Sequence, residues 1–440
     1  MTEPAASPDA AEDAPAGLRA AWRALAPSER RLIAILGTTA LIHSYDVALL
    51  SLALPQIQAG LGIADDEAGR LLGFVGLGAV PALFLALLAD RYGRRRLLLA
   101  TILGFTLCTV LSAFARTPLE FALLQLLARA FIAAEDMVAI VVIAEELSPR
   151  VRGLGFGLLS AFGGLGHGVA ALLFAAVNQL PFGWRALYLF GAAPILLIAW
   201  LRRGLPETRR FEASARARAA AEAPPRNAVA AWLVPLRELA ARDPRRLAAF
   251  VFTVLPFFVA VAPALSLQSK YLQDVHGWAP GDVSMLYLGA GGVTMVSRLA
   301  AGVASDRFGR RRVMLAGLPF LAGGILLFYD ASGPAIVVGW SLMVASLVGI
   351  ELLFDAVGAE LFPTAYRSTA SGVRAVSARL GAFVGLSLQG ALLPVLGGFG
   401  VSVSALVPGL LVTALGLLFF LPETARLELE TISGDPPERP

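Results

Sequence analysis

Cysteine, lysine and charge of either sign are all scarce in this sequence. The chain of 440 residues has one cysteine, Cys108, so it can form neither a disulfide framework nor a thiolate metal site. Charged residues make up 15% of the chain, whereas a typical soluble domain contains about 25%. The composition therefore indicates a membrane protein. We attribute the 35 arginines beside the single lysine, Lys270, to genome composition rather than to chemistry.

The residue combinations on which enzymes depend are also missing. The three histidines, His43, His167 and His276, are scattered along the chain. The sequence shows no nucleophile–base pair, phosphate-binding loop or metal-ligand spacing. We therefore expect neither an enzyme nor a bound cofactor or metal.

Apolar residues are abundant instead. They make up 57% of the chain, and the mean hydropathy is +0.72. A helix needs about 20 consecutive apolar residues to cross a bilayer. Such segments predict about twelve spans, six in each half of the chain. The expected spans are residues 32–55, 70–89, 97–114, 119–144, 154–177, 184–201, 247–271, 283–304, 313–329, 335–360, 369–394 and 400–421.

Three motifs occur twice at nearly the same spacing. The loop Ala86–Arg96, ALLADRYGRRR, returns 216 residues later as Gly302–Arg312, GVASDRFGRRR. The Glu-Leu-x-Pro motif that begins at Glu146 returns after 214 residues, and the Leu-Pro-Glu-Thr motif that begins at Leu205 returns after 216. One spacing for three motifs indicates a duplicated half, which is a mark of secondary transporters.

The duplication and the spans together predict an all-α membrane protein with twelve transmembrane helices in two pseudo-symmetric six-helix bundles. The stretch between the halves is too short for a catalytic domain, and its amphipathic segment near Ala230–Ala241 is expected to lie on the membrane surface. The expected divisions are a disordered tail at 1–31, a first bundle at 32–202, a linker at 203–246, a second bundle at 247–421 and a tail at 422–440.

Basic residues are distributed unevenly between the two sides of the expected spans. The tails and the loops after even-numbered spans hold 28 of the 36, and the opposite loops hold four. By the positive-inside rule, this imbalance predicts that both termini of a multi-pass plasma-membrane protein are cytoplasmic. The net charge of +4 then reflects the excess of basic residues on the cytoplasmic side of the membrane, and we expect no nucleic-acid partner.

Charged side chains inside the expected spans are candidates for function, because each costs about 2.5–3.5 kcal/mol on insertion scales. Counted at about 1.5 Å per residue, Asp46, Arg129 and His167 lie at one level, roughly 20–22 Å from the cytoplasmic side. The natural pair at this level is Asp46 with Arg129. Glu135 and Asp136 are adjacent, so at most one of them faces a central cavity.

The second half contains two further sets of charges at matching depth. By the same count, Glu351 is level with Arg379. Asp355 is level with Arg298 and Arg374. Two more ion pairs are thereby suggested, because unpaired charges are not tolerated at such depth.

The duplicated loop resembles the signature of the major facilitator superfamily, G-x-x-x-D-R-x-G-R-R. The second copy matches it fully, and the first departs from it at Ala86, where glycine is usual. The Glu-x-x-Pro and Pro-Glu-Thr motifs look like those of the branch that holds sugar porters, organic-ion transporters and aromatic-acid:proton symporters. The resemblance covers nearly the whole chain after the N-terminal tail and implies alternating access.

The resemblance also implies roles for the charged residues. In this superfamily spans one, four, seven and ten line the path, which favours Asp46, Glu135 and Asp355 for proton coupling. The substrate-binding candidates are Arg129, His167, Glu351 and Arg379. A cytoplasmic lock between the motif loops and nearby acids is expected to hold the outward-open state. The lock residues are Asp90, Arg91, Arg94, Arg95, Glu146, Arg152, Glu207, Asp306, Arg307, Arg310, Arg311, Glu360, Arg367 and Glu423.

We expect a proton-coupled carrier that takes up a small polar solute such as an organic acid, aromatic acids included, and works as a monomer in the lipid bilayer. A proton-driven exporter of drugs or metabolites and a sugar uptake carrier stay open as alternatives. The absence of proline from span five counts against the exporter, and the single Gln268 in span seven counts against hexose. The lack of a sizeable soluble domain counts against a membrane sensor.

Overall fold

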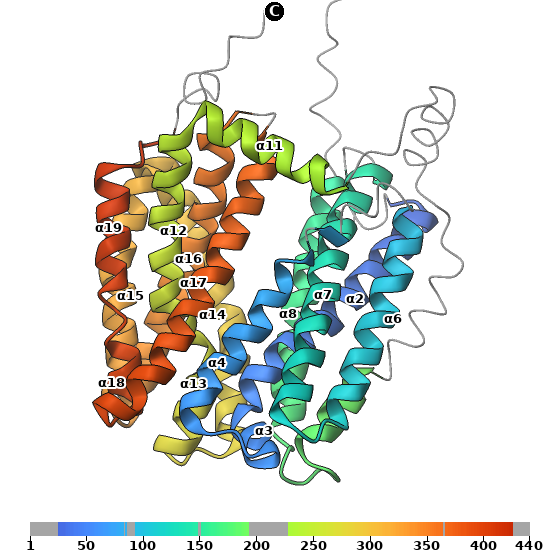
Figure 1. Ribbon diagram of the computed structural model, residues 1–440, viewed down its shortest axis with the longest axis vertical. Helices are drawn as coiled ribbons and strands as arrows, with labels where there is room; N and C mark the ends of the chain where they lie inside the picture. The colour runs from blue at the N-terminus through green and yellow to red at the C-terminus, as the bar shows by residue number, and fades with distance from the viewer. Residues whose placement is uncertain are drawn as a thin grey trace, which may run out of the picture.

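The computed structural model describes residues 25–82, 84–85, 93–147, 151–192, 228–363 and 366–425. Within these ranges the chain is helical apart from short turns (Figure 1). The first half contains α2 (Pro27–Leu52), α3 (Leu54–Leu61), α4 (Asp65–Gly76), the 3-10 turn η2 (Leu77–Ala79), α6 (Arg94–Ala113), α7 (Pro118–Glu146), α8 (Arg152–Phe174) and a further helical segment at 184–192. The second half contains α11 (Ala228–Arg242), α12 (Pro244–Ser266), α13 (Gln268–Lys270), the π-helical turn η3 (Tyr271–Val275), α14 (Pro280–Phe308), α15 (Arg310–Asp330), α16 (Pro334–Leu361), α17 (Arg367–Leu396), α18 (Phe399–Ser404) and α19 (Gly409–Phe419).

Nine helical segments in the described ranges are long and apolar enough to cross a bilayer. They fall in the expected spans one, three, five and seven to twelve. The 29-residue α7 is not among the nine, because Arg129, Glu135 and Asp136 interrupt its apolar sequence. The helix that departs most from the apolar pattern is thus one that carries candidate functional charges.

The duplicated loops share an unusual backbone conformation. Gly93 has φ 100° and ψ 144°, and Gly309, 216 residues later, has φ 102° and ψ 149°. A positive φ of this size favours glycine, because a side chain would be strained there. At Gly309 a Cβ atom would also collide with the carboxylate of Glu423. A glycine in the same conformation therefore immediately precedes both α6 and α15.

Each half forms a bundle with the same helix pairing. In the first bundle α2 packs on α8 and α6 on α7, and in the second α12 packs on α17 and α15 on α16. Gly166 of α8 touches the carbonyl of Leu41, and Gly385 of α17 touches the carbonyl of Val259, so closely that a Cβ atom on either would collide. Small residues allow such approach between membrane helices. The duplicated sequence therefore gives duplicated packing.

In the described part of the chain, the two bundles meet mainly along two helix pairs. One pair is α4 with α17, where Gly69 lies against the carbonyl of Leu386 and Gly390 against the carbonyl of Asp66. The other pair is α8 with α14. Figure 1 shows the bundles side by side, with the first in blue to green and the second in yellow-green to red.

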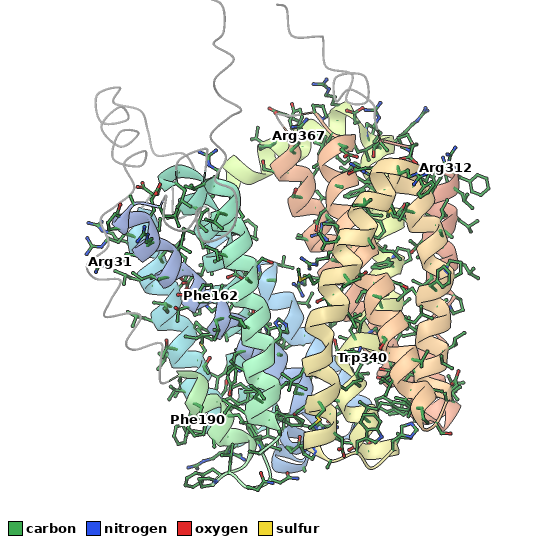
Figure 2. The ribbon with its side chains drawn as sticks, turned by 180° about the vertical axis from the view of Figure 1, so that it is seen from behind. Arg31, Phe162, Phe190, Arg312, Trp340 and Arg367 are labelled. Carbon is green, nitrogen blue, oxygen red and sulfur yellow. The ribbon has the colours of Figure 1, made fainter. Side chains whose placement is uncertain are left out.

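The two ends of the molecule differ in chemistry. Arg31, Arg312 and Arg367 all lie toward the same end of the molecule, which we call the arginine end (Figure 2). The predicted amphipathic segment forms the helix α11, which lies along this end and contacts α12 and α17 (Figure 1). The opposite end carries Asp65 and Lys270, and we call it the lysine end.

Several expected spans are divided in the structure. The second changes from α4 to the 3-10 turn η2 at Leu77, and the seventh is interrupted at Leu267, between α12 and α13. The predicted twelfth span is α18 followed by α19, with turns over residues 405–408 that finish at Pro408. A proline lacks the N–H that a helix interior requires, so a helix boundary beside Pro408 is expected on physical grounds. The first span is divided in the same way, because α2 ends at Leu52 and α3, which contains Pro55, begins at Leu54.

Candidate functional site

The first bundle buries an acid at mid-height. Asp46 of α2 is 1% exposed, and Thr109 of α6 lies 3.5 Å from its Oδ1. Arg129 of α7 is close enough to interact electrostatically with Asp46. Its Nη2 donates to the backbone carbonyl of Val47 at 3.3 Å. None of the ion pairs in the described part of the chain joins Asp46 to Arg129, so the two are neighbours without the direct pair that depth alone suggested.

A second polar group lies about one helical turn from Asp46. His43 of α2 is 2% exposed, and its Nδ1 lies 3.0 Å from Oδ1 of Asp136. Its Nε2 lies 3.7 Å from Oε2 of Glu135. Thr101 of α6 approaches the same Glu135 oxygen at 3.2 Å, and the Phe105 ring packs edge-on against the imidazole. We call His43, Glu135, Asp136 and Thr101 the histidine cluster.

The adjacent acids of α7 have different surroundings. Glu135 is 1% exposed, whereas the side chain of Asp136 is 52% exposed. Asp136 follows Arg129 by seven residues, which is close to two turns and places both on one face of the helix. Glu135 is rotated away from that face by about 120° at ~100° per residue. Asp136, rather than the candidate Glu135, therefore shares the face of Arg129.

The second bundle holds its own set of charges on α14, α16 and α17. Nη2 of Arg374 lies 2.6 Å from Oδ1 of Asp355, so the suggested pairing of Asp355 with an arginine at its level is present. Glu351, one turn earlier on α16, interacts electrostatically with Arg374, Arg298 and Arg379. Both α16 and α17 contribute to this set, and the two helices are in contact.

The charges of the two bundles approach one another through two arginines. Arg379 of α17 is exposed, and it interacts electrostatically with Arg129 of α7. Arg129 belongs to the first bundle and Arg379 to the second, so the space beside them lies between the bundles. Arginines contributed by both bundles are suited to binding a carboxylate, because each guanidinium offers forked N–H donors.

His167 of α8 was the remaining substrate-binding candidate. Its side chain is exposed, and its Nδ1 lies 3.2 Å from the carbonyl of Gly163 in the preceding turn. The neighbouring Gly166 faces α2, and Gly168 lies near Leu288 of α14. His167 is therefore on a helix that contacts both bundles.

At the arginine end, the second copy of the loop motif is held by acids of its own bundle. Arg310 pairs with Asp306, and its Nη2 lies 3.3 Å from Oε1 of Glu360. Its backbone N–H donates to Glu423 at 2.7 Å. Arg311 donates to the carbonyl of Leu418 at 2.6 Å. The structure thus brings together Asp306, Arg310, Glu360 and Glu423, four of the expected lock residues.

The remaining lock residues divide into two groups. The side chains of Arg95, Glu146, Arg152, Arg307 and Arg367 occupy helix ends at the arginine end, and the Arg307 guanidinium lies 5.3 Å from the Phe308 ring centre. Asp90, Arg91 and Glu207 lie outside the described residues, as does the side chain of Arg94.

At the lysine end, polar contacts join the two bundles. The side chain of Lys270 is 3% exposed, and its Nζ lies 2.7 Å from Oδ1 of Asp65 on α4 and 2.5 Å from Oδ2 of Asp274. Gln56 of α3 donates to Gln273 at 2.6 Å, and Ser269 donates to the backbone carbonyl of Leu52 at 2.6 Å. We call these the lysine-end contacts. They hold the bundles together at this end.

Sequence reasoning missed three of these residues. His43 was recognised only as a scattered histidine, although it lies three residues before Asp46 on one helix. Asp136 was passed over although its spacing from Arg129 places both on one face. Lys270 was attributed to genome composition, although a lone cation four residues before Asp274 is a sign of an ion pair on a helix.

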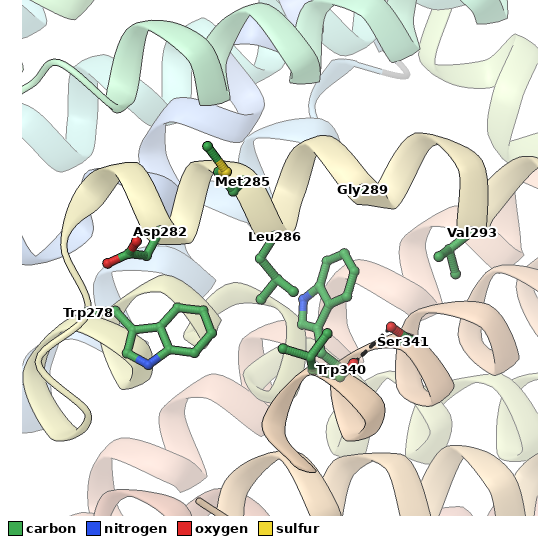
Figure 3. A pocket seen from close by; sticks show the side chains of 9 residues that line it. Trp278, Asp282, Met285, Leu286, Gly289, Val293, Trp340 and Ser341 are labelled. Carbon is green, nitrogen blue, oxygen red and sulfur yellow. Dashed lines mark hydrogen bonds between the residues drawn. The ribbon is translucent and has the colours of Figure 1, made fainter. Parts of the chain in front are cut away.

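A pocket of about 630 Å³ lies apart from these charges, between α14 and α16 (Figure 3). Trp278, Met285, Leu286 and Trp340 make most of its wall. Its one carboxylate, Asp282, accepts a hydrogen bond from the backbone N–H of Ala279 at the start of α14. No arginine lines the pocket, so it does not supply the donors that an organic anion requires.

The sequence also matches a known protein family. Residues 36–302 and 251–437 match the family model of the Major Facilitator Superfamily. The chain is 28% identical over 391 residues to the gallate transporter of Pseudomonas putida, covering 80% of this chain and 83% of that protein. It is 26% identical over 399 residues to the 4-hydroxybenzoate transporter PcaK of Pseudomonas aeruginosa, covering 83% of this chain and 87% of that protein.

A solved structure with the same fold is the inward open conformation of the xylose transporter XylE from E. coli. The TM-score is 0.70 at 17% identity, and the match covers 92% of this chain and 99% of that one. At this identity the likeness shows the fold alone. Since the family model matches most of the chain, and the helices and their duplicated packing agree with it, the chain belongs to the Major Facilitator Superfamily, whose members are multi-pass membrane transporters rather than enzymes.

Proposed function

We propose that the protein is a proton-coupled carrier that imports small organic anions, with hydroxylated aromatic carboxylates as the favoured class. The observation that carries this proposal is the approach of Arg129 and Arg379 from opposite bundles. Two like charges that interact across the boundary between the bundles favour an anion between them, because the anion offsets their repulsion and accepts their N–H donors. Gallate and 4-hydroxybenzoate, which name two relatives, are hydroxylated benzoates.

In this proposal the bundles at residues 32–202 and 247–421 rock about the central site, as in other carriers with internal repeats. The arginine end faces the cytoplasm, in agreement with the distribution of basic residues. The lysine-end contacts then close the outer side. In this proposal, substrate leaves to the cytoplasm through the arginine end while the lysine-end contacts are formed.

The other central charges are assigned supporting roles. Glu351 balances Arg379, with which it interacts, and would release it when a substrate carboxylate arrives. His167 lies on α8, which packs on α2 of the first bundle and on α14 of the second. Its surroundings would therefore change when the bundles move relative to each other. The acids that are candidates for proton coupling are Asp46 and Glu135, which are buried in the first bundle, and Asp355 in the second, whose side chain is 57% exposed.

The direct test is uptake into proteoliposomes. Labelled 4-hydroxybenzoate and gallate, with xylose as a comparison solute, are offered with and without an acid-outside pH gradient. Empty liposomes correct for passive entry of the uncharged acids. We expect gradient-driven accumulation of the aromatic acids and none of xylose. Accumulation of xylose alone would replace the proposal with a sugar carrier, and gradient-driven efflux would replace it with an exporter.

Substitution of the two arginines tests the site itself. Arg129→Gln and Arg379→Gln should each lower uptake at least tenfold, because a hydrogen bond to a charged group is worth about 1.5–3 kcal/mol. Arg70→Gln is the matched control, since Arg70 is exposed at the lysine end near Asp66 and Glu67. Its uptake should change by no more than about twofold. Full uptake in both central variants would show that the anion binds elsewhere.

A further inference from the structure

The histidine cluster is a set of titratable groups that the binding site does not use. His43 lies between two carboxylates, with Nδ1 3.0 Å from Asp136 and Nε2 3.7 Å from Glu135. The imidazole and Glu135 are buried, whereas the Asp136 side chain is 52% exposed. Asp136 is therefore the exposed side chain of the cluster, and His43 and Glu135 are its buried side chains.

Several titratable groups in the described part of the helices packed around His43 accompany it. Asp46 on the same helix interacts electrostatically with it. The α6 side is closed by Thr101 and by the edge of Phe105. The titratable or charged side chains that neighbouring helices bring to this region are Tyr45 and Asp46 on α2, Cys108 on α6, Arg129, Glu135 and Asp136 on α7, and His167 on α8.

The position suits a group that gains and loses a proton. A neutral imidazole has one N–H and can donate to one of the two carboxylates. A protonated imidazole has two N–H groups, so it can donate to both. A buried cation needs such partners, and two carboxylates supply them. Histidine is also the side chain whose unperturbed titration falls between about pH 5 and 8.

Asp46 is a less accessible place for a proton to enter. It is 1% exposed, and the contacts around it are Thr109 and the neighbouring charges. Asp136, whose side chain is 52% exposed and lies on the face of α7 that carries Arg129, is the group through which we expect water to reach His43. A proton bound by an Asp136 oxygen passes to Nδ1 of His43, so that the O–H bond breaks, the N–H bond forms and Asp136 is again a carboxylate.

Protonation of His43 would act on the anion site through Asp136. Asp136 and Arg129 lie on one face of α7, about 10 Å apart along the axis at ~1.5 Å per residue. A positive imidazolium beside Asp136 cancels a negative charge near the arginine that receives the substrate. Proton binding then favours anion binding, and by linkage anion binding favours protonation to the same degree.

We propose that His43 is the group that takes the coupling proton, received through Asp136 and held between Asp136 and Glu135. Because α2 and α7 belong to one bundle, the cluster stays together when the bundles rock, and only the side from which water reaches Asp136 changes. The inference rests on the proposed function, since it assigns the proton site of that same carrier.

The test compares two assays in the same vesicles. One is accumulation of labelled 4-hydroxybenzoate driven by an acid-outside gradient, and the other is counterflow of the same compound at equal pH. His43→Gln should lose accumulation while keeping counterflow within about twofold, since exchange needs no net proton movement. His276→Gln is the control, because His276 packs on Tyr271 in the second bundle, away from the cluster. It should keep both activities.

Asp136→Asn provides a second variant in case His43→Gln does not fold. It removes the carboxylate that passes the proton to His43 but leaves the imidazole in place. Gradient-driven uptake should therefore fall at least about tenfold, with counterflow retained. If wild type accumulates the probe and His43→Gln also does, the proton is carried elsewhere and the inference is wrong. Loss of counterflow in folded His43→Gln also overturns it, because His43 would then serve binding. If wild type itself shows no gradient-driven accumulation, the proposed function fails instead.

Discussion

The two ends of this molecule use charge differently. At the lysine end, Lys270 of the second bundle pairs with Asp65 of the first, and two glutamines pair across the same boundary. At the arginine end, Arg310 pairs with Asp306 and Glu360 of its own bundle. Contacts between bundles must break when the bundles rock, whereas contacts inside a bundle can persist. The lysine end therefore holds a conformation, and the described arginine-end cluster holds the second bundle together.

The different roles of the lysine end and the arginine end depend first on which end faces the cytoplasm. Ser28 lies exposed at the arginine end, and Ser332 lies exposed at the lysine end between α15 and α16. Single cysteines at these positions, in a Cys108→Ser background, should label from opposite sides of the membrane. We expect an all-or-none result, with Ser332→Cys accessible from outside in intact cells and Ser28→Cys only after permeabilisation. The reverse pattern would invert the proposed direction of closure.

The next effect in size is expected at the lysine end. Asp65→Lys places a second ammonium group beside the buried Lys270, which disfavours the closed state because like charges repel at this distance. Net transport should fall by about tenfold or more, and a cysteine at Ser51 should react more readily from outside. Asp65→Asn, which removes the attraction without adding repulsion, should have a smaller effect in the same direction.

The adjacent Asp66 offers a matched control for Asp65. Its side chain lies near Arg70 on its own helix rather than near the second bundle, and it is 45% exposed. Asp66→Asn should therefore leave transport and accessibility within about twofold of wild type. Equal effects of Asp65→Asn and Asp66→Asn would show that general charge, rather than the contact with Lys270, controls closure.

A smaller effect, of a different kind, is expected at the arginine end. Glu423 accepts hydrogen bonds from the backbone N–H groups of Arg310, Thr424 and Ala425. Glu423→Gln weakens a charged acceptor, and we expect it to destabilise the folded carrier by about 1–2 kcal/mol. In detergent its melting temperature should fall by a few degrees, with little change in accessibility at the lysine end. A large shift in accessibility without loss of stability would mean that this cluster also controls closure.

The sequence predicted most of the architecture, because the signals were local or periodic. The repeated loops, with Gly93 and Gly309 in the same conformation, fixed the relation between the halves. Depth counting placed Asp46 near Arg129 and predicted a partner for Asp355. Counting residues along a helix gives height, and height is set by the bilayer and the helix rise.

The neighbours around each helix were harder to predict. Depth cannot tell whether Arg129 donates to Asp46 or to the carbonyl of Val47, because both lie at one height. Contacts between the bundles, such as Lys270 with Asp65, join residues 205 positions apart and follow from how the bundles close. That arrangement depends on the conformational state, which no local pattern in the sequence encodes.

The central claim is that a proton and an organic anion move together. It is tested most directly by recording the internal pH of proteoliposomes when 4-hydroxybenzoate is added outside at equal pH. Empty liposomes and Arg129→Gln proteoliposomes give the background from passive entry. The account predicts faster internal acidification in wild-type vesicles than in either control. Entry of labelled 4-hydroxybenzoate through the wild-type protein, with acidification no faster than in the controls, would contradict it.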